Sequence, residues 1–80
     1  MPYMGEIVQV TFDVTPKDFL PCDGRLMNIS INPALFSLIG TKFGGDGRLN
    51  FGLPNYDGSA PRGSRYLICV VGEFPTPPYP

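Results

Sequence analysis

The chain has no histidine and no tryptophan, and its 80 residues include only two cysteines. Without histidine, a serine or cysteine nucleophile lacks its ordinary base, and a zinc or copper site would have to combine cysteines with carboxylates. We therefore expect no catalytic residue, no cofactor and no metal site. Cys22 and Cys69 are expected to be buried thiols, with a single disulfide between them as the alternative.

Charge and long apolar runs are also scarce. Six Lys and Arg against seven Asp and Glu give a formal net charge of −1, which argues against a nucleic-acid-binding surface. No apolar run approaches the roughly 20 residues of a membrane-spanning helix, so we expect no membrane span. The first residues lack a basic segment followed by an apolar one, and we expect no signal peptide.

Glycine and proline, by contrast, are abundant, with ten of each. Together with grouped apolar residues, they predict a small, β-rich and loop-rich single domain of the α+β class. A chain of this length buries only about 60–65% of its unfolded surface, so association with another chain would help to stabilise it.

One short helix is predicted, over about residues 33–39, packed on a few strands. Asn32 is a favourable N-cap, Pro33 suits the first helical position, and Gly40 is typical of a helix end. So short a helix does not persist alone in water and must pack on a sheet or a partner.

Two segments predict strands of different kinds. Residues 6–14 alternate apolar with polar side chains, which predicts a half-buried strand. Its apolar face consists of Val8, Val10, Phe12 and Val14. Residues 66–71 are apolar on both faces, so they predict a central strand, or one covered by the helix on one face and by another chain on the other.

A hairpin is predicted between these segments. Residues 19–22 and 26–29 flank the turn dipeptide Asp23-Gly24. Pro21 has no backbone N–H and therefore confines the first arm to a sheet edge.

Residues 41–64 are rich in glycine and predict mostly irregular chain held to the core by apolar side chains. The residues expected to do so are Phe43, Leu49, Phe51, Leu53 and Tyr56. Within this region, Gly44-Gly45-Asp46-Gly47 lacks the pattern of a phosphate-binding loop.

Three acidic residues of the chain are best interpreted as parts of turns. Asp23, Asp46 and Asp57 each stand directly before a glycine, as an Asx-type turn requires. The oxygen donors of this region do not have the spacing of an EF-hand calcium loop.

Candidate partner or receptor residues lie in the glycine-rich region and at the end of the last strand. The three arginines there are either solvated loop charges or contacts to another chain. The full candidate set is Arg48, Tyr56, Arg62, Arg65, Val70, Val71, Phe74 and Pro75. We place the domain at residues 1–74 and treat 75–80 as a Pro-rich extension, expected to be polyproline-like and either frayed or a docking strap.

Spaced motifs along nearly the whole chain resemble those of the phage tail collar domain, found in short tail-fibre proteins and in bacterial proteins called microcystin-dependent. The motifs are Gly5-Glu6-Ile7, Cys22-Asp23-Gly24, Ala34-Leu35-Phe36, Gly44-Gly45-Asp46-Gly47, Phe51-Gly52-Leu53-Pro54 and Gly72-Glu73-Phe74-Pro75. The resemblance implies a non-enzymatic virion protein of the tail, made in the bacterial host cytoplasm, commonly trimeric and bound to other tail or fibre proteins.

This chain departs from the family pattern at several points, with Phe19 nearest the position of a common Trp and Asn55 where Asp is common, and the largest difference is length. Many members carry a long segment between the Arg62-Gly63 region and the final strand, where receptor-binding elaborations are placed. Its absence favours a minimal structural component of a tail fibre or baseplate that docks with itself or with other tail proteins. The alternative is a tip that recognises a host cell-surface glycan through the aromatic and arginine residues of the 43–65 loop.

Overall fold

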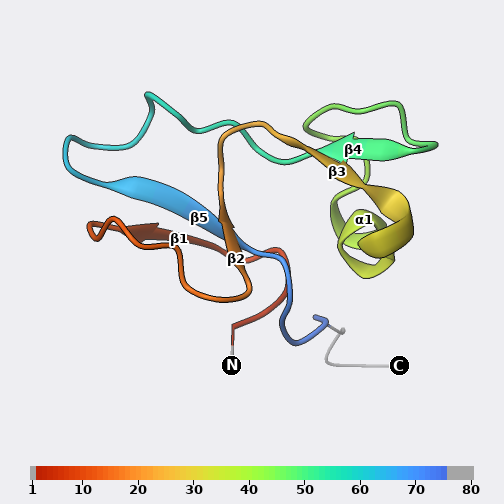
Figure 1. The fold of residues 1–80 in the computed structure, drawn as a ribbon, viewed down its shortest axis with the longest axis horizontal. Coiled ribbons are helices and arrows are strands. Elements are labelled where there is room, and N and C mark those ends of the chain that lie inside the picture. The colour runs from red at the N-terminus through yellow and green to blue at the C-terminus, as the bar shows by residue number, and fades with distance from the viewer. Residues whose placement is uncertain (1, 76–80) are drawn as a thin grey trace.

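The computed structural model describes residues 2–75, which form five strands in two sheets, one α-helix and one 3-10 turn (Figure 1). The strands are β1 (Ile7–Val10), β2 (Phe19–Pro21), β3 (Leu26–Asn28), β4 (Asn50–Gly52) and β5 (Arg65–Cys69). The helical elements are η1 (Ile29–Ile31) and α1 (Pro33–Ile39). The small α+β class and the helix over 33–39 are thereby confirmed, whereas the predicted polyproline-like residues 76–80 lie outside the described range.

β5 is the centre of the larger sheet, whose strand order is β1-β5-β2. Both neighbours run antiparallel to it, and Leu67, Ile68 and Cys69 are all buried. The predicted central strand is confirmed. Its apolar residues on both faces follow from burial on both sides of the sheet.

β2 lies at an edge of this sheet, as its proline predicts. The backbone N–H groups of Cys22 and Val70 donate to the carbonyl oxygens of Tyr66 and Asp18, respectively. Because antiparallel pairing alternates, Pro21 falls between bonded positions and turns its missing N–H toward the free edge.

β1 begins with a bulge that requires glycine. The Gly5 N–H donates to the Cys69 carbonyl oxygen at 2.8 Å, and the Cys69 N–H donates to that of Glu6 at 2.9 Å. Gly5 and Glu6 thus lie opposite the single residue Cys69. Gly5 has a φ of 87°, and the two features together define a G1 bulge. The Glu6 side chain also accepts from the Tyr3 N–H at 3.0 Å, so the Gly-Glu pair fixes how the chain enters β1.

The strand predicted for residues 6–14 is too long. β1 ends at Val10, and the side chains of Phe12 and Val14 are 46% and 70% exposed. Since β1 and β2 lie on either side of β5, residues 11–18 must cross from one edge of the sheet to the other and cannot continue the strand.

The predicted hairpin is wrong. β2 pairs with β5, whereas β3 pairs with β4 in a separate two-stranded ribbon. The Asp23-Gly24 pair does not reverse the chain. Gly24 donates to Pro54 O at 3.1 Å, and Leu53 donates to Arg25 O at 2.9 Å, so this segment runs alongside 53–55 and carries the chain from one sheet to the other.

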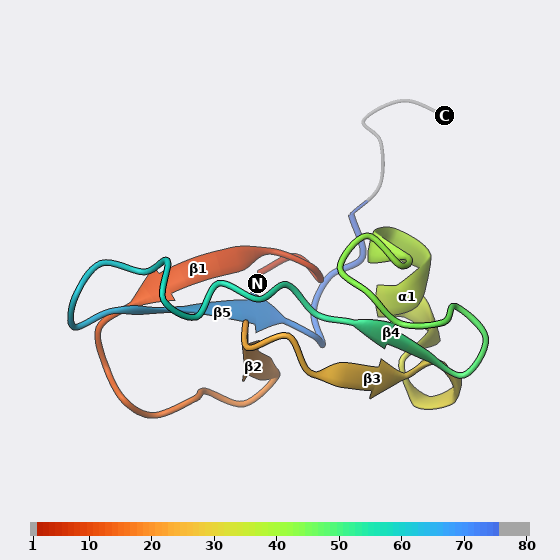
Figure 2. The ribbon, with the colours of Figure 1, turned by 90° about the horizontal axis from the view of Figure 1, so that it is seen from above.

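The helix lies on the ribbon rather than over the three-stranded sheet, which corrects our expectation that it covers the strand 66–71. Figure 2 shows the two sheets end to end, with α1 beside β4. The ring centroids of Phe36 in α1 and Phe51 in β4 are 5.4 Å apart, so the helix packs on the ribbon. One core nevertheless joins helix, ribbon and sheet, and its fully buried members are Cys22, Leu35, Phe51, Leu53 and Ile68.

The ends of α1 match the prediction in position but only partly in chemistry. Asn32 is the N-cap residue, yet its side chain makes no capping bond and instead donates to Asn28 O at 2.9 Å. Gly40 ends the helix with a φ of 55°, and its N–H donates to Phe36 O at 2.7 Å, as the sequence predicts.

Of the apolar residues expected to hold the 41–64 region to the core, Phe51 and Leu53 do so and are fully buried. Tyr56 is partly buried against them. Phe43 and Leu49 are 41% and 73% exposed, so that part of the prediction is wrong. The two cysteines are free and buried, which confirms the preferred interpretation.

Candidate functional site

A hollow of about 370 Å³ opens between the 56–59 segment and β5, lined by Tyr56, Ser59 and Tyr66. The two tyrosine rings meet edge to face, with centroids 5.6 Å apart and an interplanar angle of 73°. This volume lies at the low end of the range of ligand pockets, about 300–1,000 Å³. Aromatic walls with polar tips are suited to binding rather than to chemistry.

The backbone of buried Cys22 positions both tyrosines. Its N–H donates to Tyr66 O at 3.0 Å, and its carbonyl oxygen accepts from the Tyr56 N–H at 2.9 Å. Because Cys22 belongs to the core, the two walls of the hollow are fixed relative to each other. The sequence singled out Tyr56 but not Tyr66 or Ser59. Tyr66 stands next to buried Leu67 in β5, and strand alternation could have placed it on the other face.

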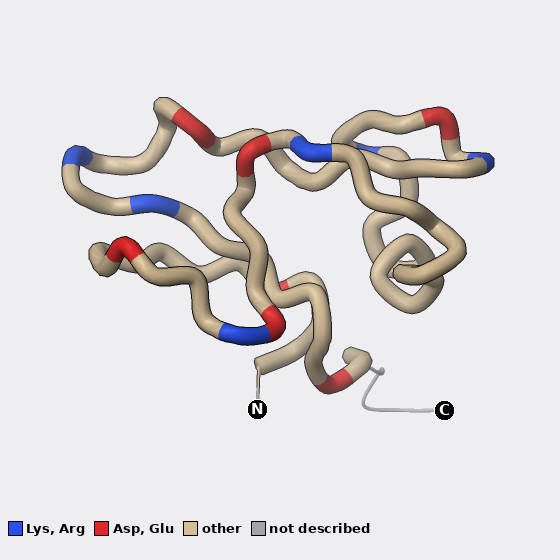
Figure 3. Tube along the Cα trace, in the orientation of Figure 1, with Lys and Arg blue, Asp and Glu red and all other residues tan. Residues whose placement is uncertain are grey.

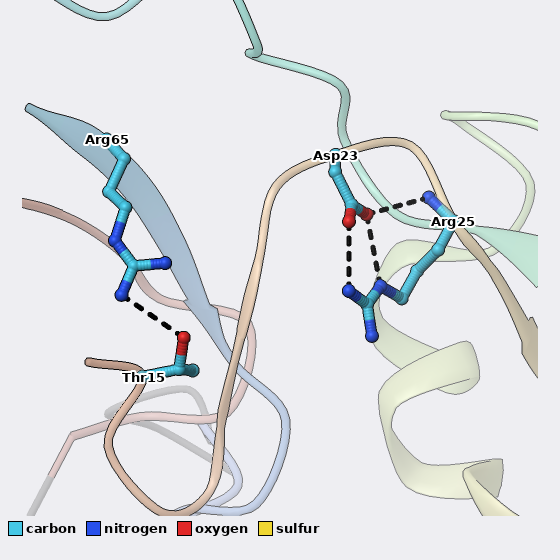
Figure 4. Close-up of polar contacts among 4 residues, drawn as sticks. All are labelled: Thr15, Asp23, Arg25 and Arg65. Atoms are coloured by element: carbon cyan, nitrogen blue, oxygen red, sulfur yellow. Dashed lines mark hydrogen bonds and ion pairs between the residues drawn. The ribbon is translucent and has the colours of Figure 1, made fainter. Parts of the chain in front are cut away.

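Arg65 binds its own chain. Its guanidinium donates to Phe12 O at 3.1 Å, to Val14 O at 2.5 Å and to Thr15 Oγ1 at 3.2 Å. Figure 4 shows the side chain reaching from β5 to the crossover at Thr15. The 11–18 crossover is therefore held on the sheet by a residue that we had placed among the candidates for a partner surface.

Arg48 and Arg62 are exposed, and within residues 2–75 their side chains make no hydrogen bond or ion pair. They do not form one surface. The segment before β4 and the segment after residue 56 lie at opposite ends of the molecule (Figure 1). β4 thus divides the 43–65 loop into two separate parts. Figure 3 shows Lys and Arg positions spread along the described chain and interspersed with acidic positions.

A charge pair that sequence reasoning missed lies at the turn between the two sheets. Arg25 Nη2 and Asp23 Oδ2 are 2.9 Å apart, and the Arg25 N–H and Nε–H both donate to Asp23 Oδ1 (Figure 4). The hydrogen bond from the Arg25 side chain lowers the pKa of Asp23. The residue after an Asp-Gly dipeptide could have been recognised as its partner.

The glycine-rich loop is a capped turn, which confirms the interpretation of Asp46. Its Oδ1 accepts backbone N–H groups of Arg48, Leu49 and Asn50 at 2.8, 2.9 and 3.2 Å. These bonds lower the pKa of the Asp46 carboxyl. In the Asn55–Asp57 turn it is Asn55 Oδ1 that accepts the Asp57 N–H, so the amide caps there.

The candidates after β5 lie on a segment that pairs with the N-terminal residues. Met4 donates to Glu73 O at 2.8 Å, and Glu73 donates to Pro2 O at 3.1 Å. Val71 and Phe74 are 58% and 45% exposed, and Tyr3, whose backbone bridges to Glu73 between them, is 49% exposed. Val70 packs partly against the core. We call Tyr3, Val71 and Phe74 the terminal apolar strip.

Exposed apolar side chains that sequence reasoning did not assign to a surface lie along the ribbon and η1. They are Leu26, Ile31 and Leu49, with exposed fractions of 60%, 77% and 73%. Leu49 lies directly across from η1, because its carbonyl oxygen accepts the Ile29 N–H at 3.0 Å.

The chemistry available to these groups is limited. Burial and the nearby Asp23 carboxylate raise the pKa of the Cys22 thiol to about 11, so it is protonated and weakly nucleophilic at neutral pH. Residues 2–75 contain no group of three or more Cys, Asp or Glu side chains placed to hold a metal ion. In the same range, no helix has the length and apolarity to cross a membrane.

Fold and surface together define a small structural domain with exposed apolar side chains and an aromatic hollow. The model of the phage tail collar domain family matches residues 5–61, more than half of the chain. The chain therefore belongs to that family, and is a structural protein of the phage tail-fibre type. No curated protein sequence matches it significantly.

Proposed function

We propose that this domain is a docking module of the phage tail that binds a second copy of itself or another tail or fibre protein, without catalysis. One observation carries the proposal. Among the described residues, ten large hydrophobic side chains are exposed, whereas seven hydrophobic residues form the buried core. So high a proportion of exposed apolar side chains favours an interaction surface over a freely soluble monomer.

The terminal apolar strip is the best-supported docking surface. Tyr3 comes from one segment of the described chain and Val71 and Phe74 from another, and the backbone bonds between 2–4 and 73 hold the two segments side by side. Aromatic residues are enriched at protein interfaces, where a few side chains supply most of the binding energy. Membership of a tail family supports a place in the virion tail, within a fibre or a baseplate.

The experiment is sedimentation of the full chain from about 1 to 100 μM. We expect concentration-dependent oligomers, with trimers favoured. Val71→Asp and Phe74→Asp should each raise the dissociation constant at least ~10-fold by placing a charge in the contact. Val14→Asp is the matched control, because Val14 is exposed on the crossover, away from the strip. A monomer at every concentration that also binds no tail protein would refute the proposal.

A second candidate function is recognition of a host cell-surface glycan, and the hollow between Tyr56 and Tyr66 favours it. Sugars bind on aromatic faces, and the tyrosine and serine hydroxyls offer hydrogen bonds. Tyr56→Ala should abolish adsorption to cells or to a glycan array. Arg48→Ala should not, because its loop lies at the other end of the molecule. Unchanged adsorption by Tyr56→Ala would eliminate this site.

A further inference from the structure

Residues 75–80, with the sequence Pro-Thr-Pro-Pro-Tyr-Pro, have the composition of a ligand for aromatic pockets. Four of the six are proline, and the segment contains the spacing P-x-x-P twice. Proline fixes φ and removes a backbone donor, so such segments favour the extended polyproline II helix and present free carbonyl oxygens. Their usual receptors are grooves lined with aromatic rings.

The hollow beside β5 has the matching properties. Two tyrosine rings at 73° to each other form a right-angled wall on which a proline ring can pack. The tyrosine and Ser59 hydroxyls can donate to carbonyl oxygens, which are the only backbone groups that proline offers. The Cys22 backbone fixes both walls, so a ligand would not have to order them first.

The geometry favours a neighbouring copy over the same chain. In Figure 1 residues 56–61 run along the upper margin, and residues 72–74 lie at the lower margin. Whatever their conformation, five residues beyond Pro75 span at most about 18 Å. The molecular extent across the view is 31 Å. A segment leaving at one margin therefore reaches the hollow of another molecule more readily than its own.

We propose that the Pro-rich segment 75–80 of one copy binds in the Tyr56–Ser59–Tyr66 hollow of a second copy. This inference rests on the proposed docking function and names its partner and its site. The contact is head to tail, so each copy offers one segment and one hollow. Such heterologous contacts close into rings where the rotation between copies allows it.

Two full-length variants test the contact by complementation. Ser59→Trp fills the hollow from an exposed position and leaves the segment intact. The double variant Pro77→Ala and Pro78→Ala weakens the segment and leaves the hollow intact. Each variant alone should lose self-association at least ~10-fold. When mixed, they should form a one-to-one complex, because one supplies the segment and the other the hollow.

Controls keep the outcomes distinct. Urea unfolding, at a concentration at which the parent chain is monomeric, should show that both variants remain as stable as the parent chain. Phe12→Ala removes an exposed aromatic side chain on the crossover, outside the hollow and the terminal apolar strip, and should leave the complementation unchanged. If both variants associate as well as the parent, the inference is overturned and docking proceeds through another surface. If the parent associates and the mixed variants do not, the inference is also overturned. A parent chain that is monomeric, and does not bind a 74–80 peptide at millimolar concentration, overturns both the inference and self-docking.

Discussion

Arg65 is an example of a side chain whose role depends on what lies opposite it in space. Three acceptors, at Phe12, Val14 and Thr15, surround its guanidinium, and all belong to the crossover that passes over β5. Arg62, three residues earlier, is exposed. Sequence alone could not separate the two, because the acceptors are distant from Arg65 along the chain.

Replacing Arg65 should destabilise the fold. Arg65→Ala removes three charge-assisted donors and frees the crossover, so we expect the free energy of unfolding to fall by about 1–2 kcal/mol. Arg62→Ala is the matched control and should change it by less than about 0.5 kcal/mol. Urea unfolding monitored by circular dichroism measures both. Equal losses for the two variants would mean that Arg65 does not hold the crossover.

The capped turn at Asp46 should make stability depend on pH in a defined direction. Backbone N–H bonds from Arg48, Leu49 and Asn50 lower the folded pKa of Asp46 below its ordinary value of 3.8. The stability contributed by the ionised carboxylate is therefore present above that ordinary value and is lost as pH falls through the lower, folded pKa.

Asp46→Asn isolates this contribution, because the amide keeps an acceptor oxygen but carries no charge. We expect the parent chain to be more stable than the variant at pH 6 and the difference to shrink by pH 3. Urea midpoints at the two pH values, with NMR titration of the Asp46 carboxyl, measure this. A difference that stays constant between pH 6 and pH 3 would contradict the capping role.

At the scale of elements, local signals predicted local structure. Proline at position 33 and glycine at 40 placed the helix correctly, and Pro21 placed an edge strand. The capped turn at Asp46 was predicted from its Asp-Gly dipeptide, whereas the same dipeptide at Asp23 does not reverse the chain. What failed was pairing: an Asp-Gly turn indicates a change of direction, but hydrogen bonds to Pro54 and from Leu53 decide where the chain goes next.

In the candidate site too, the sequence identified single residues but not the contacts between them. Tyr56 could be named from composition, but its partner Tyr66 could not, since their contact depends on Cys22 bonding to both. The 43–65 loop was treated as one surface, because no local signal strong enough for a strand marked β4. Its three residues are a strand only through their pairing with β3.

Close approach of β4 to the loop before it yields a prediction for Gly52. A Cβ there would lie 2.5 Å from the Phe43 carbonyl oxygen and 3.0 Å from its carbonyl carbon, both backbone atoms that cannot move aside cheaply. Gly52→Ala should cost at least about 3 kcal/mol of unfolding free energy.

Gly40→Ala is the control for Gly52. Gly40 has a positive φ, but a Cβ added there would meet no other atom within 4 Å, so the cost is confined to a backbone conformation that residues other than glycine rarely adopt, about 1–3 kcal/mol. Thermal unfolding of both variants compares them. A Gly52→Ala chain as stable as Gly40→Ala would show that the ribbon and loop do not pack this closely.

At the scale of the whole molecule, two sheets share one core, and β5 makes that possible. Ile68 contributes to the cluster that also contains Leu35 and Phe51, and β5 is the only strand described that pairs with both β1 and β2. The family match ends at residue 61, before β5 begins. The matched segment therefore lacks the strand that closes the core, which is why we propose residues 1–74 as the folding unit.

Truncation tests that boundary. A chain of residues 1–74 keeps every strand, the helix and the backbone bonds between Glu73 and the N-terminal segment. Its urea midpoint should therefore equal that of the full chain at a concentration at which the full chain is monomeric. A chain of residues 1–61 loses Leu67, Ile68 and Cys69, three of the seven buried hydrophobic residues, together with the only pairing partner of β1 and β2 within the described fold. It should show no cooperative unfolding, because its remaining core cannot offset the conformational entropy of the chain. A cooperative transition for 1–61 would move the boundary of the folding unit to the end of the family match and make β5 an addition to a domain already complete.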